Sequence, residues 1–297
     1  MTDIDLSGVY PAIVTPFNAD DSIDFDRLTT LVRDLEDRGV DGIVPVGSTG
    51  ESATLTHDEH IEVVEAVVDT VSVPVIAGAG SNSTHEAVSL AQRSADVGAD
   101  ALLLLSPYYN KPEPTGMEEH FRRIADAVDL PQIVYNVPSR TGRNVEVDTT
   151  VSLAEHPNVA GYKAASGDLG MISELAERTQ DLDFTILSGD DGLTLPIMSV
   201  GGEGVISVAA NVEPERTSAL VEAALADDYA TARSTHHELG PLFRTLFIET
   251  NPIPVKEAVA QRYGWEAHYR LPLSPPSDEH RAVIRDVLAD LEEPIEA

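Results

Sequence analysis

Short apolar segments rich in β-branched residues recur along this chain at intervals of roughly 25–30 residues, and amphipathic helical patterns fill the intervals between them. The segments are residues 9–16, 41–47, 74–80, 100–107, 131–138, 159–166, 184–190 and 204–211. Strands that alternate with helices pair in parallel through right-handed crossovers, and eight such units close a barrel. The sequence therefore predicts an α/β protein, with a (β/α)8 TIM barrel over residues 1–226.

No further strand pattern follows residue 226. Residues 229–247, 254–263 and 277–292 have the periodicity of three more helices. Because these helices exceed what an eight-unit barrel needs, we expect residues 227–297 to form a C-terminal helical extension of one compact unit.

Acidic side chains dominate the composition. The chain has 51 acidic and 19 basic residues and a net charge of -32, with the carboxylates spread through every segment. Such a field repels nucleic acid and anionic membranes, so we expect neither as a partner. Only three of the basic residues are lysines (Lys111, Lys163 and Lys256). Dispersed acid with few lysines indicates adaptation to a salt-rich cytoplasm, where charge screening is strong.

Several classes of protein are excluded by what the sequence lacks. It contains no cysteine, which removes disulfides, thiol nucleophiles and cysteine-ligated metals. No stretch approaches the ~20 apolar residues that cross a bilayer, and the acidic first residues are unlike a signal peptide. These features favour a cytoplasmic enzyme.

Lys163 lies within the apolar run G-Y-K-A-A-S at the predicted end of the sixth strand. It could extend its ammonium to water, or it could be buried and kept neutral enough to act as a nucleophile. Burial that lowers its pKa by roughly three units corresponds to about 4 kcal/mol, which an apolar barrel interior can supply. A neutral amine in that place can attack a keto acid carbonyl, and Tyr135 on the adjacent strand is a suitable proton shuttle.

Other polar groups also follow predicted strands, and barrel enzymes gather their functional groups there. Ser48 and Thr49 lie in the turn G-S-T-G-E, and Arg140 follows the fifth strand, so all three could meet Lys163 at one mouth. A metal site is the competing interpretation, and it would use His57, His60, Asp190 and Asp191. Those histidines are more typical of a helix surface and those aspartates of a helix cap, so we expect no metal and no cofactor.

Several motifs, taken together, resemble the dihydrodipicolinate synthase/N-acetylneuraminate lyase family over almost the whole chain. They are G-S-T-G-E-S, S-P-Y-Y-N-K-P, Y-N-V-P-S-R-T-G, G-Y-K-A-A-S-G-D, L-S-G-D-D, G-V-I-S-V-A-A-N and N-P-I-P-V-K. The resemblance implies a cofactor-free class I aldolase-type lyase that forms a Schiff base between Lys163 and pyruvate. It is closest to members that condense pyruvate with L-aspartate 4-semialdehyde on the diaminopimelate route to lysine. The alternatives are a family aldolase for a sugar acid, such as 2-keto-3-deoxygluconate or N-acetylneuraminate, and a homologue without catalysis.

The resemblance also implies roles for the other site residues. Tyr135, Ser48 and Tyr109 would form a proton relay, with Tyr109 reaching the site of a neighbouring subunit in a homotetramer built as a dimer of dimers. Ser48 stands where the family usually has threonine, which leaves its rotamer less restricted. The pyruvate pocket would be formed by Thr49, Gly47, Gly50 and Ile206, and Arg140 would bind the carboxylate of the aldehyde.

A regulatory site is implied in the same way. Family members that are inhibited by L-lysine bind it at the tight-dimer interface. The matching residues are Ser52, Ala53, His57, His60, Asn82, Glu86 and Tyr108. L-lysine is therefore a candidate feedback inhibitor of this protein.

Overall fold

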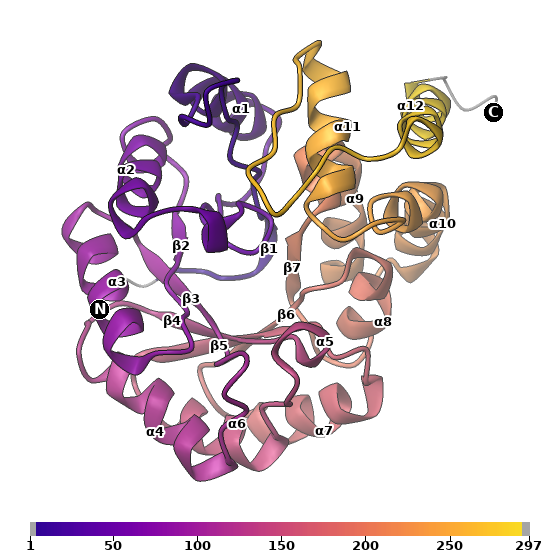
Figure 1. The fold of residues 1–297 in the computed structure, drawn as a ribbon. Helices are drawn as coiled ribbons and strands as arrows, with labels where there is room; N and C mark the ends of the chain where they lie inside the picture. The colour runs from indigo at the N-terminus through magenta and orange to yellow at the C-terminus, as the bar shows by residue number, and fades with distance from the viewer. Residues whose placement is uncertain (1–3, 293–297) are drawn as a thin grey trace.

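The computed structural model describes residues 4–292 and has a barrel of parallel strands inside a ring of helices (Figure 1). The strands are β1 (Gly8–Pro11), β2 (Ile76–Gly78), β3 (Ala101–Leu105), β4 (Gln132–Asn136), β5 (Val159–Ala164), β6 (Thr185–Ser188) and β7 (Gly204–Ser207). They pair in the order β1-β7-β6-β5-β4-β3-β2, and every pairing is parallel. The predicted barrel is confirmed.

The second predicted strand, residues 41–47, is reduced to two bridging residues that close the barrel between β1 and β2. The bridges pair Ala12 with Val44 and Ile43 with Val75, both in parallel. The segment cannot continue as a regular strand, because Pro45 has no N–H to donate and Val46 adopts a left-handed φ of 50°. Prediction of a full strand here was wrong, although the segment takes the expected place in the barrel.

Two hydrophobic clusters follow from the alternation of side chains along the strands. One cluster fills the inside of the barrel and includes Tyr10, Leu103, Ile133 and Leu187, all of them buried. The larger cluster lies between the strands and the surrounding helices. The inside is thus a packed core, and only the strand ends leave room for a site.

The helices follow the predicted amphipathic patterns. Around the barrel they are α1 (Phe25–Asp37), α2 (His57–Val68), α3 (Thr84–Asp96), α4 (Pro114–Ala125), α5 (Pro138–Thr141), α6 (Val147–Ala154), α7 (Leu169–Thr179), α8 (Thr194–Met198) and α9 (Pro214–Leu225), with short 3-10 turns η1 (Ser52–Thr54), η2 (Asp191–Leu193) and η3 (Ala209–Asn211). A Thr56–Glu59 capping box begins α2, and aspartate side chains cap α1 and α7. No helix within residues 4–292 is both long and apolar enough to cross a membrane.

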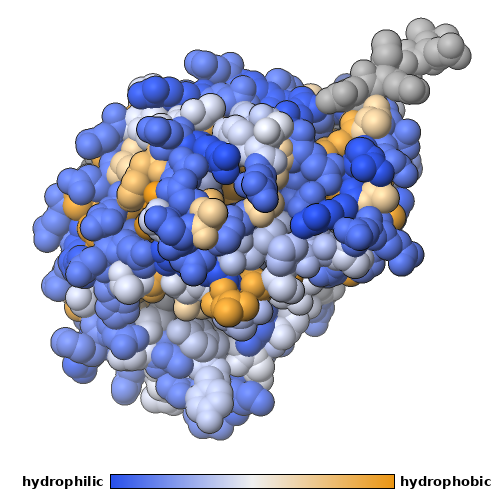
Figure 2. All heavy atoms as spheres, turned by 45° about the horizontal axis from the view of Figure 1, so that its top comes forward, coloured by the Kyte–Doolittle hydropathy of each residue, from blue (hydrophilic) through white to orange (hydrophobic). Residues whose placement is uncertain are grey.

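Three helices follow residue 226, as expected from the sequence. They are α10 (Tyr229–Thr245), α11 (Ile253–Tyr263) and α12 (Asp278–Glu292). They lie together beside α9 on one side of the barrel (Figure 1), and α11 also contacts η3 at the strand ends. The molecular face in Figure 2 is mainly hydrophilic, with small scattered apolar patches. Through the contact of α11 with η3, the C-terminal helices reach the strand ends, where a site is expected.

Candidate active site

A cavity of about 440 Å³ opens at the carboxyl ends of the barrel strands. Its lining residues come from turns and strand ends far apart in the sequence and from the loop between α10 and α11. They include Gly47, Ser48, Thr49, Leu103, Tyr135, Val137, Ser139, Arg140, Lys163, Ala165, Asp190, Val208, Phe247, Glu249 and Asn251. The structure thus brings together the five residues that the sequence placed at one mouth: Lys163, Tyr135, Ser48, Thr49 and Arg140.

Lys163 and Tyr135 occupy paired positions on β5 and β4. The Lys163 side chain is 5% exposed, and its Nζ lies 4.3 Å from the centroid of the Tyr135 ring. Burial lowers the pKa of Lys163 to about 7, although the carboxylate of Asp191 opposes the shift; Arg140 adds to it. Near neutral pH a large share of the amine is therefore unprotonated and able to act as a nucleophile.

Tyr135 is buried and faces the inside of the barrel. Burial raises the pKa of its phenol to about 12, while Arg140 and a hydrogen bond with Ser48 act in the opposite direction. The phenol therefore holds its proton at neutral pH; its ring lies beside the amine, and its hydroxyl is hydrogen-bonded with Ser48. This arrangement suits a group that passes protons to and from a reacting centre.

The turn at residues 47–51 forms one wall of the cavity. Gly50 and Ser52 donate backbone N–H groups to the carbonyl of Gly47, at 3.1 and 3.3 Å. Within residues 4–292, the backbone N–H groups of Ser48 and Thr49 have no recorded hydrogen-bond acceptor in the protein. Two such donors beside two hydroxyls can hold an anionic group such as a carboxylate.

Arg140 lies in the one-turn helix α5 and also lines the cavity. Its Nη2 donates to the carbonyl of Asn251 at 2.7 Å, and Asn251 Nδ2 donates to Thr49 Oγ1 at 2.9 Å. Asn251 therefore connects the arginine to the turn. Sequence reasoning gave Asn251 no role, although N-P-I-P-V-K was among the motifs that carried the resemblance.

Comparison with known proteins supports what this geometry suggests. A model of the Dihydrodipicolinate synthetase family matches residues 5–291. A 4-hydroxy-tetrahydrodipicolinate synthase of Haloarcula marismortui, from a halophilic source, is 66% identical over 293 residues, which cover 98% of this chain and 96% of the relative. The chain belongs to the dihydrodipicolinate synthetase family.

Solved structures of the family share the fold. A chloride-inhibited dihydrodipicolinate synthase of Acinetobacter baumannii, complexed with pyruvate, superposes with a TM-score of 0.94 at 40% identity, covering 97% of this chain and 99% of that one. A family structure from Cyanidioschyzon merolae with lysine bound has a TM-score of 0.92 at 39% identity, covering 96% and 98%.

Three residues to which the family resemblance assigns a role lie outside the cavity lining in this chain. Tyr109 is 88% exposed and has a left-handed φ of 67°. Ile206 is buried inside the barrel, and Val208, two residues further on, borders the cavity instead. Gly50 contributes its carbonyl to the hydroxyl of Thr15 at 2.7 Å. The roles of these three residues remain predictions.

The residues matching the family's lysine site lie in η1, in the first turns of α2, around the start of α3 and, for Tyr108, in the loop after β3. Ala53, His57, Glu86 and Tyr108 are exposed, whereas Ser52 and Asn82 are half-buried. His60 is 4% exposed, and its Nε2 lies 2.6 Å from the carbonyl of Gly78, so the expectation of a surface histidine was wrong. It packs inward because position 60 falls on the apolar face of α2.

The aspartates considered as metal ligands have other partners. Asp190 caps η2 by accepting the backbone N–H of Gly192 at 2.9 Å. Asp191 is buried, and its carboxylate accepts hydrogen bonds from the Ser207 hydroxyl at 2.5 Å and the Val208 N–H at 3.0 Å. No group of three or more His, Cys, Asp or Glu residues within residues 4–292 is arranged to hold a metal ion.

Proposed function

We propose that this chain catalyses the 4-hydroxy-tetrahydrodipicolinate synthase reaction. As a class I aldolase-type lyase, it would condense pyruvate with L-aspartate 4-semialdehyde through a Schiff base on Lys163, on the diaminopimelate route to lysine. The observation that carries this proposal is the buried Lys163 amine, 4.3 Å from the Tyr135 ring at the mouth of an apolar barrel. The 66% identity to the Haloarcula synthase supports the choice of reaction within the family.

The covalent steps balance without a cofactor. The neutral amine of Lys163 attacks the keto carbon of pyruvate, and the adduct takes up one proton and loses one water to give a protonated imine. The imine draws electrons from the methyl carbon, which loses a proton and becomes an enamine. The enamine adds to the aldehyde carbon, and the amino group of the aldehyde substrate then displaces Lys163 as it closes the ring. Tyr135 and Ser48 would move the protons, and Tyr109 of a neighbouring subunit would complete their relay.

The cavity offers one group of donors for each of the two substrate carboxylates: the backbone N–H groups of the turn and the guanidinium of Arg140. The turn with Ser48 and Thr49 would hold the carboxylate of pyruvate, together with Gly47, Gly50 and the apolar contact of Ile206. Arg140, which also lines the cavity, would hold the carboxylate of the aldehyde, because a guanidinium presents parallel donors to both oxygens. A sugar acid would need a set of hydroxyl and amide partners at this end of the cavity.

The oligomer and the cell compartment belong to the same proposal. Exposed Tyr109 would be covered by a partner subunit in a homotetramer, a dimer of dimers. A biosynthetic enzyme for free metabolites would act in the cytoplasm. No nucleic acid or membrane partner is proposed, because the net charge of -32 opposes both.

L-lysine is the proposed feedback inhibitor. The family structure with lysine bound supports this, as does the exposure of Glu86 and Tyr108, two residues of the predicted site. Titration calorimetry with L-lysine in molar salt, beside inhibition kinetics, tests the idea. Partial inhibition that pyruvate does not relieve is expected. An absence of both binding and inhibition at millimolar lysine would contradict it.

Borohydride reduction in the presence of pyruvate tests the reaction class. Reduction should attach a stable three-carbon adduct to Lys163 alone, as located by peptide mass mapping. Adducts on Lys111 or Lys256, or no adduct, would overturn the mechanism. Parallel assays of condensation with L-aspartate 4-semialdehyde and of cleavage of 2-keto-3-deoxygluconate and N-acetylneuraminate then separate the synthase from the other family aldolases.

A further inference from the structure

The chain buries a second lysine, and it lies close to the substrate turn rather than in the cavity. Lys256 is on α11, and its Nζ lies 2.5 Å from Oε1 of Glu51, the last residue of the turn. The side chains are 4% and 0% exposed, and the two residues are 205 positions apart in the sequence.

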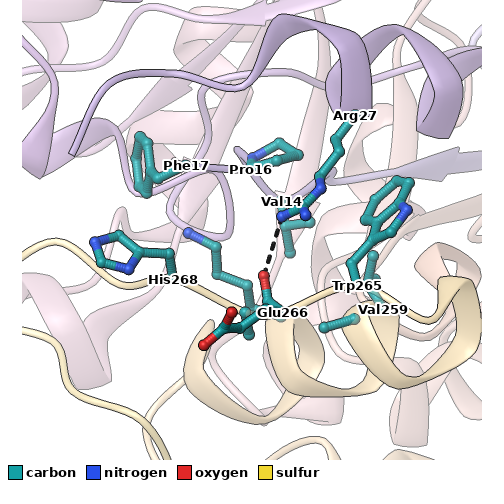
Figure 3. A pocket seen from close by; sticks show the side chains of 11 residues that line it. Val14, Pro16, Phe17, Arg27, Val259, Trp265, Glu266 and His268 are labelled. Carbon is teal, nitrogen blue, oxygen red and sulfur yellow. Dashed lines mark hydrogen bonds between the residues drawn. The ribbon is translucent and has the colours of Figure 1, made fainter. Parts of the chain in front are cut away.

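Aromatic rings and the Glu51 carboxylate surround the Lys256 ammonium. Its Nζ lies 4.0 Å from the centroid of the Phe17 ring and 5.5 Å from that of Tyr269. Lys256 borders the small cavity in Figure 3, of about 20 Å³, which has room for roughly one water. Phe17, Trp265 and His268 surround that cavity (Figure 3). Lys256 thus has neither the space nor the access to act as a nucleophile on a keto acid.

Glu51 adopts an unusual backbone conformation, with φ 56° and ψ 32°, in the left-handed region. A residue with a long side chain stays in this region only where its surroundings determine it. The turn is confined on its other side as well. A Cβ added to Gly50 would come within 3.0 Å of the Val46 backbone nitrogen, and Val46 is itself left-handed. The conformation of the turn therefore depends on what holds Glu51.

A buried ion pair adds little net stability, because desolvation of both charges offsets their attraction. Here burial lowers the pKa of Lys256 to about 8 and raises that of Glu51, and each charge favours the ionised form of the other. Such a pair does fix the relative position of its two side chains, because each buried charge is stabilised only while it stays beside the other. The same segment makes a second connection to the turn, from Asn251 Nδ2 to Thr49 Oγ1.

We propose that Lys256 is a positioning residue for the keto acid. It acts through Glu51, by fixing the corner of the turn that presents Ser48 and Thr49. The proposal rests on the proposed function, in which this turn binds the pyruvate carboxylate. It assigns the C-terminal helix α11 a part in substrate binding in addition to its packing on the barrel.

Replacement of Lys256 by methionine tests the proposal. Lys256→Met should raise the KM for pyruvate about tenfold or more, the effect of losing one well-placed charged hydrogen bond. The KM for aspartate semialdehyde and kcat should change less than about threefold, because Arg140 and Lys163 keep their own supports. Tyr263→Phe is the matched control. It removes another bond between α11 and the barrel, from the Tyr263 hydroxyl to Asp34, without touching the turn.

Lys256→Met leaves the Glu51 charge unpaired and can fail to fold, so a second variant carries the same test. Glu51→Gln/Lys256→Met contains no buried charge at this place and should fold, yet it lacks the ion pair and should keep the raised KM for pyruvate. A normal pyruvate KM in this variant overturns the proposal. An equal rise of the pyruvate KM in Tyr263→Phe also overturns the proposal. That control is assayed at the same temperature as the other variants and below its own melting temperature. Wild-type protein that forms no imine with pyruvate would overturn the proposed function itself, and this proposal with it.

Discussion

Lys163 and Tyr135 are register partners on neighbouring parallel strands, and the amine lies over the face of the phenol ring with Nζ 4.3 Å from its centroid. Burial acts on the two groups in opposite directions. It lowers the pKa of the amine to about 7 and raises that of the phenol to about 12, so near neutral pH about half of the amine is unprotonated while the phenol keeps its proton. A neutral nucleophile beside a protonated acid is the arrangement that imine formation requires.

The rate of imine formation should rise with pH through about 7 and level off above it, because only the neutral amine of Lys163 attacks the keto acid. Single-turnover borohydride trapping with pyruvate between pH 5.5 and 9 measures this. Asp191→Asn should move the midpoint to lower pH, because the Asp191 carboxylate favours the charged amine. A midpoint near the ordinary lysine pKa of ~10.4 would contradict the role of burial.

Tyr135→Phe should lower kcat about 10²–10⁴-fold, because it removes the proton-transferring hydroxyl while keeping the ring that packs inside the barrel. Steady-state kinetics with both substrates measure the loss, and thermal melting should show little change. Tyr162→Phe is the matched control, since Tyr162 is equally buried next to Lys163 but belongs to the outer cluster. If both variants kept full activity, Tyr135 would have no part in proton transfer.

Arg140→Ala should raise the KM for aspartate semialdehyde far more than that for pyruvate. Loss of a charged hydrogen-bonded pair costs about 2–5 kcal/mol, or roughly 30-fold and upward in affinity. Arg143→Ala serves as the control, because Arg143 pairs with exposed Glu113 at 2.8 Å and does not line the cavity. Equal increases for the two substrates would instead mean that Arg140 acts through its bond to Asn251.

The melting temperature should rise with added KCl. The net charge of -32 makes the folded surface repel itself, and the Debye length shortens from about 10 Å at 0.1 M to about 3 Å at 1 M salt. Glu62→Lys/Glu65→Lys, at two exposed positions of α2, should gain less from the same salt because it removes part of the repulsion. Calorimetric melts in a KCl series measure both. A melting temperature that does not depend on salt would refute adaptation to a saline cytoplasm.

Stability should fall as the pH drops from about 6.5 towards 4. Burial lowers the pKa of His60 and of His120 to about 4, below the ordinary histidine value of 6.5. Between these values the unfolded chain binds more protons than the folded one, so protonation favours unfolding, by on the order of 3 kcal/mol per histidine at the acid end. Urea unfolding at pH 7 and pH 5 should show a smaller difference for His60→Gln, whose amide can still donate to Gly78. If His60→Gln shows the same stability difference between pH 7 and pH 5 as the wild type, His60 does not contribute to the loss of stability in acid.

The sequence alone determined the barrel and the centre of its site, because both depend on local patterns. Apolar segments that alternate with amphipathic helices leave few alternatives to parallel strands in a barrel, and parallel strands bring their carboxyl ends to one mouth. Lys163, Tyr135, Ser48, Thr49 and Arg140 each follow or end such a segment, so their meeting at one cavity could be predicted.

Tertiary structure decided what no local period encodes. The break in the second strand depends on Pro45 and left-handed Val46, and the hydrogen-bond partner of buried His60 is the carbonyl of Gly78 on β2. The Lys256–Glu51 pair joins positions 205 residues apart, and each residue taken alone resembles an ordinary surface charge. Only the folded chain places α11 over the substrate turn, because its helix packs against the mouth of the barrel and removes both charges from water.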